Sequence, residues 1–388
     1  MVKKMDFELA EEQKDIKRAA REFCEKELTA ELALEFDRKE EFPLQLYKEA
    51  AKLGFTSMRF PERYGGQGYG LLEDCLVVEE MCRVDPGLGV AIMSGTFALP
   101  DLVLAHGTEE QKREYILPLC RGDEVSAGAF TEPEHGSDLS FMDTTAIKKG
   151  DGWVINGDKQ FITNAPVADS FCVLCQTDPK AKPTYRGESL FLVDKGTSGL
   201  DITKLKDKMG IRPAVTGAVS FSDVKVAEDK VVGELNKGFY YVLEFFDESR
   251  IPIAAQAVGM AQGAFERAFS YAKERKQFGS PIIQFQGISF KLADMATKIE
   301  TARLLTYKAA WMYDQGKMDP MLTAMAKAYA SKAAMEITDE AIQIYGGYGY
   351  LADYHVERFH RCAKITEIYE GTTEIQKLTI MRYLLKRM

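Results

Sequence analysis

Apolar residues recur at intervals of three and four through the first third of the chain. Ile16 and Phe23 belong to such a pattern, and the same spacing continues through residues 72–81 and 108–119. This periodicity is typical of amphipathic α-helices that bury one face. A glycine-rich loop at residues 61–70 interrupts it, but the loop is not G-x-G-x-x-G and follows no clear strand. The first third therefore predicts a helical layer without a Rossmann nucleotide site.

The pattern changes to short apolar runs in the middle of the chain. Such runs occur at 153–156, 171–174, 190–193 and 218–221, separated by clusters of Gly, Asp, Asn and Pro. Several short strands with regular turns favour a small β-barrel or sandwich. Within this region Asn156-Gly157-Asp158 has the composition of a tight hairpin turn, so we expect a turn there.

Long helical patterns return near residue 236. They cover 254–273, 286–315, 320–345 and 374–388, with many alanines in the third of them. Small residues allow helices to pack closely, as in a four-helix bundle. The order of patterns predicts an α+β fold of three domains: an N-terminal α-helical domain (1–125), a middle small β-barrel domain (126–235) and a C-terminal four-helix bundle (236–388).

Charge and composition exclude several classes of protein. The 388 residues carry a net charge of −9, from 59 acidic and 50 basic residues, with no basic segment to suit nucleic acid or an anionic membrane surface. No uninterrupted apolar run reaches the roughly 18 residues of a membrane span. We therefore expect a cytoplasmic protein that binds neither nucleic acid nor a membrane.

The seven cysteines predict neither disulfides nor a metal site. Their number is odd and most lie among apolar neighbours, which suits reduced thiols in a reducing compartment. Cys172 and Cys175 form a C-x-x-C, but odd spacing on a strand points them to opposite faces. No second Cys or His pair lies nearby in the sequence, so we expect no metal.

Near the C-terminus, residues 368–376 place Glu370 beside Gly371, directly before an amphipathic tail. A glycine permits backbone conformations closed to other residues and removes side-chain bulk. Thr372 suits the N-cap of the helix that follows. Taken alone, this pattern is typical of a helix start with a solvated acid. A catalytic carboxylate is favoured over this reading only when the other motifs of the chain are taken into account.

Four further stretches carry more polar or aromatic chemistry than packing requires. They are residues 128–138, 159–164, 275–279 and 343–350. They combine hydroxyls, turns and aromatics, and one of them pairs a cation with a ring, which suits a phosphate and a flat ligand. All five stretches, in this order and on an α–β–α scaffold, resemble the acyl-CoA dehydrogenase family of flavoenzymes, with short-chain butyryl-CoA dehydrogenases as the nearest type. The resemblance covers essentially the whole chain.

The resemblance implies FAD as cofactor and an acyl-CoA as substrate. Glu370 would be the catalytic base. Substrate contacts would come from Ser137, Asp247, Arg250 and Gly371. Cofactor contacts would come from Gly128, Phe130, Thr131, Phe161, Ile162, Thr163, Arg275, Phe278, Gln286, Gln343, Gly346, Gly347, Thr372 and Glu374.

The resemblance also implies a reaction and an assembly. Glu370 would abstract the α-proton of the thioester and flavin N5 would take the β-hydride, because no side chain accepts a hydride. The electrons would pass to an electron-transfer flavoprotein. The enzyme would be a homotetramer, a dimer of dimers, in which Arg275 and the 343–347 stretch complete a neighbour's FAD site. A branched or alicyclic acyl-CoA substrate, an oxygen-dependent oxidase and a non-catalytic scaffold remain alternatives.

The chain departs from its relatives at two points. Phe161 stands where many of them have tryptophan, which keeps a ring but loses an indole N–H. Ser249 stands where some relatives carry the base, so Glu370 has no rival there, although Glu248 is adjacent and needs testing. Residues 90–100 contain no acid, which argues against the variant mechanism that relatives acting on cyclic acyl-CoAs use.

Overall fold

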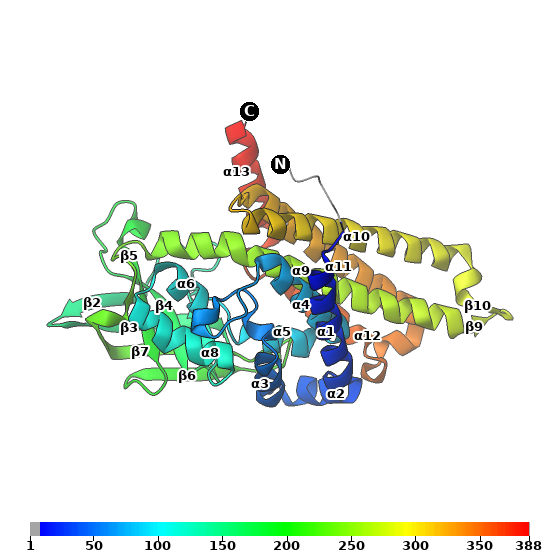
Figure 1. Cartoon of the computed structure of the whole chain (residues 1–388), viewed down its shortest axis with the longest axis horizontal. Helices are drawn as coiled ribbons and strands as arrows, with labels where there is room; N and C mark the ends of the chain where they lie inside the picture. The colour runs from blue at the N-terminus through cyan, green and yellow to red at the C-terminus, as the bar shows by residue number, and fades with distance from the viewer. Residues whose placement is uncertain (1–7, 388) are drawn as a thin grey trace.

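The computed structural model describes residues 8–387 and shows three parts arranged along one long axis (Figure 1). A β-sheet lies at one end, the N-terminal helices cover the middle, and long C-terminal helices extend to the other end. This arrangement confirms the predicted α+β fold class, with helices before and after a central sheet.

The N-terminal part is helical, as its periodicity predicts. Its second helix starts where the Thr29 hydroxyl accepts a hydrogen bond from the Leu32 amide, and α5 starts where Asp85 caps the Leu88 amide. A π-helical turn, Lys112–Ile116, joins the last two helices. The helices are α1 (Glu11–Glu27), α2 (Ala30–Lys39), α3 (Leu44–Lys52), α4 (Leu71–Val84), α5 (Pro86–Ser94), α6 (Leu99–His106), α7 (Glu109–Gln111) and α8 (Leu117–Arg121).

The middle part forms one sheet in the order β6-β7-β3-β2-β4-β5-β8, with β1 parallel to β4. Its end strands β6 and β8 are not paired with each other in the described chain, so the barrel-like sheet stays open. The strands are β1 (Ser126–Ala129), β2 (Thr145–Lys149), β3 (Gly152–Thr163), β4 (Ser170–Gln176), β5 (Glu188–Asp194), β6 (Leu200–Leu205), β7 (Thr216–Ala227) and β8 (Val231–Val232).

The expected turn at Asn156-Gly157-Asp158 is wrong. These residues lie inside β3, and the chain reverses between β2 and β3 at residues 149–152 instead. Gly157 marks an irregularity in the pairing of β3 with β7, with φ +141°. A Cβ at this position would come within 2.5 Å of the Thr144 Cα, so the glycine serves a close approach inside the sheet.

Both faces of β4 are buried, and this strand carries the two closely spaced cysteines. Cys172 packs in the cluster between the sheet and the N-terminal helices, and Cys175 packs in the core of the sheet itself. The predicted opposite orientation of the two thiols is therefore confirmed. All seven cysteines are buried and free.

The C-terminal part is built on α9, which runs almost the full length of the molecule (Figure 1). This helix starts earlier than its pattern predicts, because the polar residues 247–250 are accommodated inside it by side-chain partners. The elements are α9 (Gly238–Glu274), β9 (Lys276–Gln277), β10 (Ser280–Pro281), α10 (Gln286–Asp314), α11 (Pro320–Tyr345), α12 (Val356–Ala363) and α13 (Thr373–Arg387).

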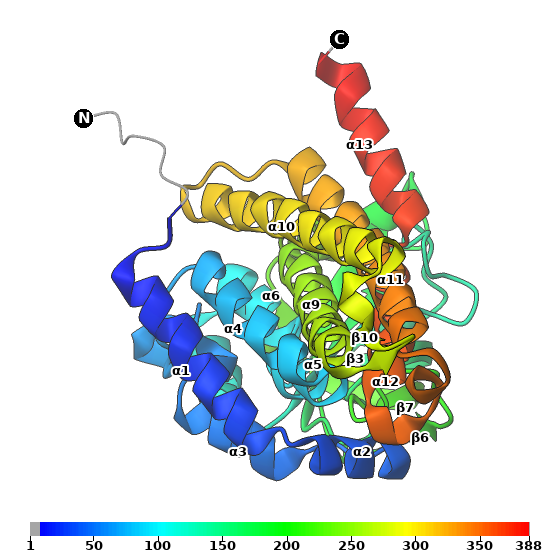
Figure 2. The ribbon, with the colours of Figure 1, turned by 90° about the vertical axis from the view of Figure 1, so that its right-hand side faces the viewer.

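Helices α9, α10 and α11 pack together, and α4 joins them on a further side of α9. Gly263 permits this last contact, because a Cβ there would lie 2.1 Å from the Arg83 carbonyl oxygen of α4. By contrast, α13 packs against α11 and then projects from the body (Figure 2). Gln376 is its one buried residue among those described.

The segment Pro86–His106, which spans α5 and α6, is long and apolar enough to cross a membrane. Most of its most apolar window, 78%, is buried inside the fold. Its apolar character is therefore explained by its place in the core, between the sheet and the helices.

Candidate active site

Glu370 lies on a tight turn between the 3₁₀ helix η9 (Lys364–Glu367) and α13. Both Glu370 and Gly371 have left-handed backbone conformations, with φ +53° and +86°. Such a conformation is strained for a glutamate and costs about 1–3 kcal/mol, so the surrounding structure must impose it. Thr372 caps α13 as predicted, because its hydroxyl accepts a hydrogen bond of 3.3 Å from the Ile375 amide.

The glycine of this turn has a packing reason that the sequence does not reveal. A Cβ on Gly371 would lie 2.7 Å from the Gln376 side-chain nitrogen and 3.3 Å from Ile375. The space beside Gly371 is thus filled by the first turn of α13. Its substrate contact stays a prediction that would involve the main chain.

The Glu370 carboxylate is held by helix α9. Its Oε2 accepts a hydrogen bond of 2.6 Å from the Ser249 hydroxyl. Burial raises the pKa of Glu370 above its ordinary value, while the Ser249 hydrogen bond and the charges of Arg250 and Lys327 oppose this rise. A raised pKa brings a carboxylate closer to the range in which it exchanges protons effectively near neutral pH.

The Ser249 contact leads to a testable result. In Ser249→Ala the ionised carboxylate loses a hydrogen bond, so the pKa of Glu370 rises further and less base is present at a given pH. We expect the rate of flavin reduction by substrate to fall about tenfold at neutral pH, with its acid limb moved to higher pH. Anaerobic stopped-flow absorbance across pH measures both. The control Ser270→Ala, exposed on the same helix, should match the wild type, and an unmoved acid limb in Ser249→Ala would contradict this role.

Two predicted substrate residues lie beside Glu370 on α9. Arg250 is buried and donates from Nη1 to the Asp247 carboxylate at 2.7 Å. Burial raises the pKa of Asp247 and lowers that of Arg250. The Arg250 Nε is buried without a hydrogen-bond partner in the described part of the chain. The predicted Ser137 is exposed on the loop between β1 and β2.

The residues predicted to meet the flavin ring gather at the ends of β1 and β3. The Gln160 amide donates to the Thr131 carbonyl at 2.9 Å and joins the two segments. Beside this bond the β3–β7 pairing is irregular, and Phe161 has φ +60° and is 64% exposed. The irregularity therefore turns an aromatic ring outward, next to the half-buried hydroxyls of Thr131 and Thr163.

Three other residues of this group offer backbone rather than side chains. The Phe130 ring is buried against Phe245 and Phe246 of α9, with ring centroids 6.3 and 6.0 Å apart. The Ile162 side chain packs in the core of the sheet. Gly128 faces Ala98, whose Cβ would lie 2.7 Å from an added Cβ. A flat ligand would meet these residues at main-chain atoms.

A second group of predicted cofactor residues forms a pocket of about 460 Å³ at the far end of α9. Arg275 lines it together with Gly346 and Gly347, and its guanidinium lies 5.6 Å from the centre of the Tyr348 ring. An added Cβ on either glycine meets open space, so a side chain there would stand in the pocket. A cation, open backbone and aromatic faces suit the diphosphate and adenine of a dinucleotide. The predicted Phe278, Gln286 and Gln343 are exposed near this end of the molecule.

The two groups lie far apart along α9. Arg275 ends α9, 26 residues after Ser249, which separates them by roughly 39 Å along the helix axis. This exceeds the length of an extended FAD. Figure 1 shows the same separation, with the β9–β10 hairpin beside Arg275 at the end of the molecule opposite the sheet.

The neighbouring acid Glu248 has other partners. It forms an ion pair with Arg59, and its Oε2 accepts a hydrogen bond of 2.6 Å from the Tyr313 hydroxyl. Arg59 also pairs with Asp101 at 2.6 Å. Glu248 on α9 therefore contacts both the N-terminal part of the chain and α10, while its neighbour Ser249 contacts Glu370.

One group of potential metal ligands, Glu132, His135 and Asp143, lies on the loop between β1 and β2. Glu132 already pairs with the Lys159 ammonium at 2.8 Å and accepts from the Asp143 and Thr144 amides. A cation placed there would meet the ammonium charge. The absence of a metal stays a prediction.

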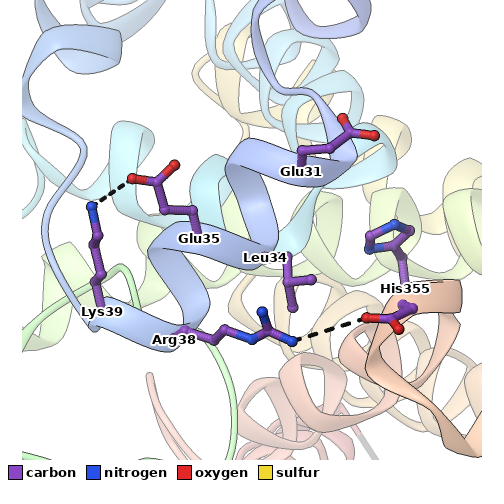
Figure 3. A pocket seen from close by; sticks show the side chains of 7 residues that line it. Glu31, Leu34, Glu35, Arg38, Lys39 and His355 are labelled. Carbon is purple, nitrogen blue, oxygen red and sulfur yellow. Dashed lines mark hydrogen bonds and ion pairs between the residues drawn. The ribbon is translucent and has the colours of Figure 1, made fainter.

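Another pocket, of about 480 Å³, lies between α2 and the 3₁₀ helix η8 (Ala352–Tyr354), as Figure 3 shows. Its charges are largely paired among themselves, through Lys39 with Glu35 at 2.5 Å and Arg38 with Asp353 at 3.9 Å. Neither Glu370 nor Arg275 lines it. It is separate from the candidate active site.

Comparison with known proteins places this geometry in a family. Three family models match consecutive parts of the chain: acyl-CoA dehydrogenase N-terminal domain at 10–123, middle domain at 127–224 and C-terminal domain at 236–385. The chain belongs to the acyl-CoA dehydrogenase family. It is thus a flavoprotein oxidoreductase of the acyl-CoA dehydrogenase kind, and its cofactor is FAD.

Individual relatives match over nearly the whole chain. The short-chain specific acyl-CoA dehydrogenase of Clostridium acetobutylicum is 44% identical over 97% of this chain and 98% of its own length. The caffeyl-CoA reductase–Etf complex subunit CarC of Acetobacterium woodii is 42% identical over 97% and 99%. The structure of butyryl-CoA dehydrogenase from Megasphaera elsdenii superposes with a TM-score of 0.94, at 41% identity, over 98% of this chain and 100% of the other.

The sequence did not indicate three residues around Glu370. Ser249 stands where some relatives carry the base, but the sequence gives no sign of its hydrogen bond to Glu370. Gln376 lies in the first turn of α13, where a polar side chain suggests exposure, but it is fully buried against the Glu370 turn. Lys327 was not singled out, although a single lysine within the alanine-rich stretch 324–330 is a signal that could have found it.

Proposed function

We propose that this chain catalyses the α,β-dehydrogenation of a short-chain acyl-CoA thioester to the trans-2-enoyl-CoA. The observation that carries the proposal is the Glu370 carboxylate, held on a strained turn by Ser249 with its pKa raised by burial. Glu370 takes the α-proton of the thioester. Its main-chain N–H donates to the thioester oxygen, on which negative charge develops. FAD, when bound, would supply the acceptor for the β-hydride, which no side chain can provide.

The other predicted residues take binding roles in this proposal. Arg250, with its free buried Nε, and Asp247 orient the substrate beside Glu370, together with Ser137 and the Gly371 main chain. One chain holds the flavin ring through the ends of β1 and β3 and the start of α13. The residues of this group are Gly128, Phe130, Thr131, Phe161, Ile162, Thr163, Thr372 and Glu374.

We propose that a second copy of the chain completes each FAD site. The roughly 39 Å between Ser249 and Arg275 along α9 supports this, because one dinucleotide cannot span it. The projecting α13 exposes Leu378 (64%), Met381 (50%) and Leu385 (71%), which suits burial against another copy. The expected assembly is a homotetramer, a dimer of dimers. Residues Arg275, Phe278, Gln286, Gln343, Gly346 and Gly347 act in the neighbour's site.

Three finer points belong to the same proposal. The electrons pass to an electron-transfer flavoprotein, as the A. woodii relative's association with Etf supports. The domain boundaries fall near residues 125 and 235, where helical and β-structure alternate. The location is cytoplasmic, since seven buried free thiols suit a reducing compartment.

The substrate is tested by a panel of acyl-CoA thioesters. We expect butyryl-CoA to bleach the flavin under anaerobic conditions at least about tenfold faster than palmitoyl-CoA or cyclohexanecarbonyl-CoA, since even one misfitting methylene costs about 1–3 kcal/mol. The relatives from C. acetobutylicum and M. elsdenii support the short chain. A faster reaction with a branched or cyclic thioester would contradict this assignment, and rapid flavin reoxidation by air would indicate an oxidase.

The A. woodii relative favours one second candidate, an enoyl-CoA reductase that works with a flavoprotein partner. The same residues would then return a proton from Glu370 to the α-carbon. Equilibration of the flavin with a butyryl-CoA and crotonyl-CoA pair, with and without a reduced electron-transfer flavoprotein, distinguishes the two. Net reduction of crotonyl-CoA as the faster direction with the partner present would support the reductase.

A further inference from the structure

Lys327 lies in the first third of α11 with its side chain fully buried. Its ammonium donates to the Gly371 carbonyl oxygen at 2.7 Å. None of the ion pairs among residues 8–387 involves it. Burying a cation without a carboxylate in contact costs several kcal/mol. Packing of α11 alone therefore gives no reason for a lysine at this position.

Gln376 approaches the same turn from the other side. Its side chain is also fully buried, and Nε2 donates to the carbonyl oxygens of Glu370 at 3.1 Å and Gly371 at 2.8 Å. The Gly371 oxygen thus accepts from both Lys327 and Gln376, which uses its two lone pairs. Together the two side chains fix the peptide groups that follow Glu370 and hold its left-handed conformation, with φ +53°.

The charges that face Lys327 come from every element around it. Glu370 lies on the turn, Arg250 on α9, Glu367 on η9 and Glu374 on α13. Burial lowers the pKa of Lys327 to about 8, and Glu370 exerts the largest opposing effect. The ammonium is therefore still mainly protonated at neutral pH. In turn its charge favours the ionised form of Glu370, against the effect of burial.

We propose that Lys327 is a positioning residue for the reaction: with Gln376 it holds the Glu370–Gly371 turn, and its charge keeps the Glu370 carboxyl ionised. This role rests on the proposed function, in which Glu370 is the base. It assigns two tasks to one buried lysine, one geometric and one electrostatic. The two tasks separate in experiments, because Gln376 shares the first and not the second.

The test is the titration of Glu370 itself, followed by infrared difference spectroscopy of its protonated carboxyl band in the FAD-loaded enzyme. The band is assigned by its loss in Glu370→Gln. In Lys327→Met we expect the titration midpoint to rise by about one pH unit or more, because an opposite charge nearby lowers a carboxyl pKa by about 1–3 units. The acid limb of flavin reduction should move with it.

Two variants serve as comparisons. Lys17→Met removes a lysine that pairs with Glu79 between α1 and α4 and, among residues 8–387, forms no ion pair with the Glu370 turn. It should lower the melting temperature and leave the midpoint unchanged. Gln376→Met removes the neutral clamp and keeps the charge, so flavin reduction should slow about tenfold without a shift of the midpoint. Should Lys327→Met not fold, Lys327→Gln also removes the charge while keeping a polar group, and the same shift is expected.

The results separate this proposal from the proposed function. An unmoved Glu370 midpoint in the folded Lys327 variant overturns the role of Lys327, whatever Glu370 does. The titration needs no turnover, so it measures the effect of Lys327 on the Glu370 carboxyl directly. If substrate reduced the flavin of Glu370→Gln as fast as that of the wild type, the proposed function would be wrong. The role of Lys327 in the reaction would then be wrong as well.

Discussion

We expect Glu370→Gln to be a folded, yellow protein whose flavin is no longer bleached when substrate is added. Glutamine keeps the shape of the side chain and can accept the Ser249 hydrogen bond, but it cannot take a proton. General base catalysis contributes about 10²–10⁴-fold, so we expect flavin reduction to slow about 10³-fold. Anaerobic stopped-flow absorbance after mixing with butyryl-CoA measures the rate, and the FAD to protein ratio shows that the cofactor is retained.

A nearby carboxylate provides the matched control. Glu367 lies three residues earlier and pairs with Lys364 at 2.7 Å. Glu367→Gln loses this partly exposed pair and should reduce its flavin at close to the wild-type rate. If the rate of flavin reduction fell equally in Glu367→Gln and Glu370→Gln, the cause would be a general disturbance of the turn and not the loss of a base.

Two inactive variants are expected to form an active enzyme when they assemble together. Arg275→Glu places an acid in the pocket proposed for the FAD diphosphate, and alone it should bind FAD about 100-fold more weakly. Glu370→Gln alone binds FAD but lacks the base. In a mixed dimer, the chain with intact Glu370 receives Arg275 from its neighbour, so one complete site forms.

The yield of this complementation can be estimated. Equal amounts of the two chains give heterodimers in about half of random pairs, each with one complete site, so activity should reach about a quarter of the wild-type value. A pair of Arg275→Glu with the double variant R275E/E370Q should stay inactive. Lys276→Glu, an exposed change beside Arg275, controls for the altered charge. Absence of activity in the mixed assembly would place both groups of residues in the same chain's site.

Local patterns predicted most of the fold. The helical periods of 286–315 and 320–345 correspond to α10 (Gln286–Asp314) and α11 (Pro320–Tyr345) within a residue. The errors occur where long-range packing overrides local chemistry. Gly157 reads as a turn residue, but its neighbours in space keep it within β3. The polar residues 247–250 interrupt the apolar pattern of α9, but Arg59 and Tyr313 satisfy Glu248 inside the helix.

The candidate site divides in the same way. Glu370, Thr372 and the pocket residues Arg275, Gly346 and Gly347 follow from short stretches and from the family resemblance. The contacts that tune Glu370 join residues far apart in the sequence, because Ser249 lies 121 residues from it and Lys327 lies 44 residues from Gly371. No local pattern reports such pairs, so the structure was needed to find them.

The central claim is that Glu370 removes the α-proton of the thioester. Exchange of that proton with solvent tests it most directly, with butyryl-CoA incubated in D₂O with enzyme whose flavin is already reduced, so that no net oxidation occurs. The account predicts that deuterium appears at the α-carbon with the wild type and Glu367→Gln, measured by NMR of the recovered thioester, and not with Glu370→Gln. Exchange at the wild-type rate in Glu370→Gln would contradict it.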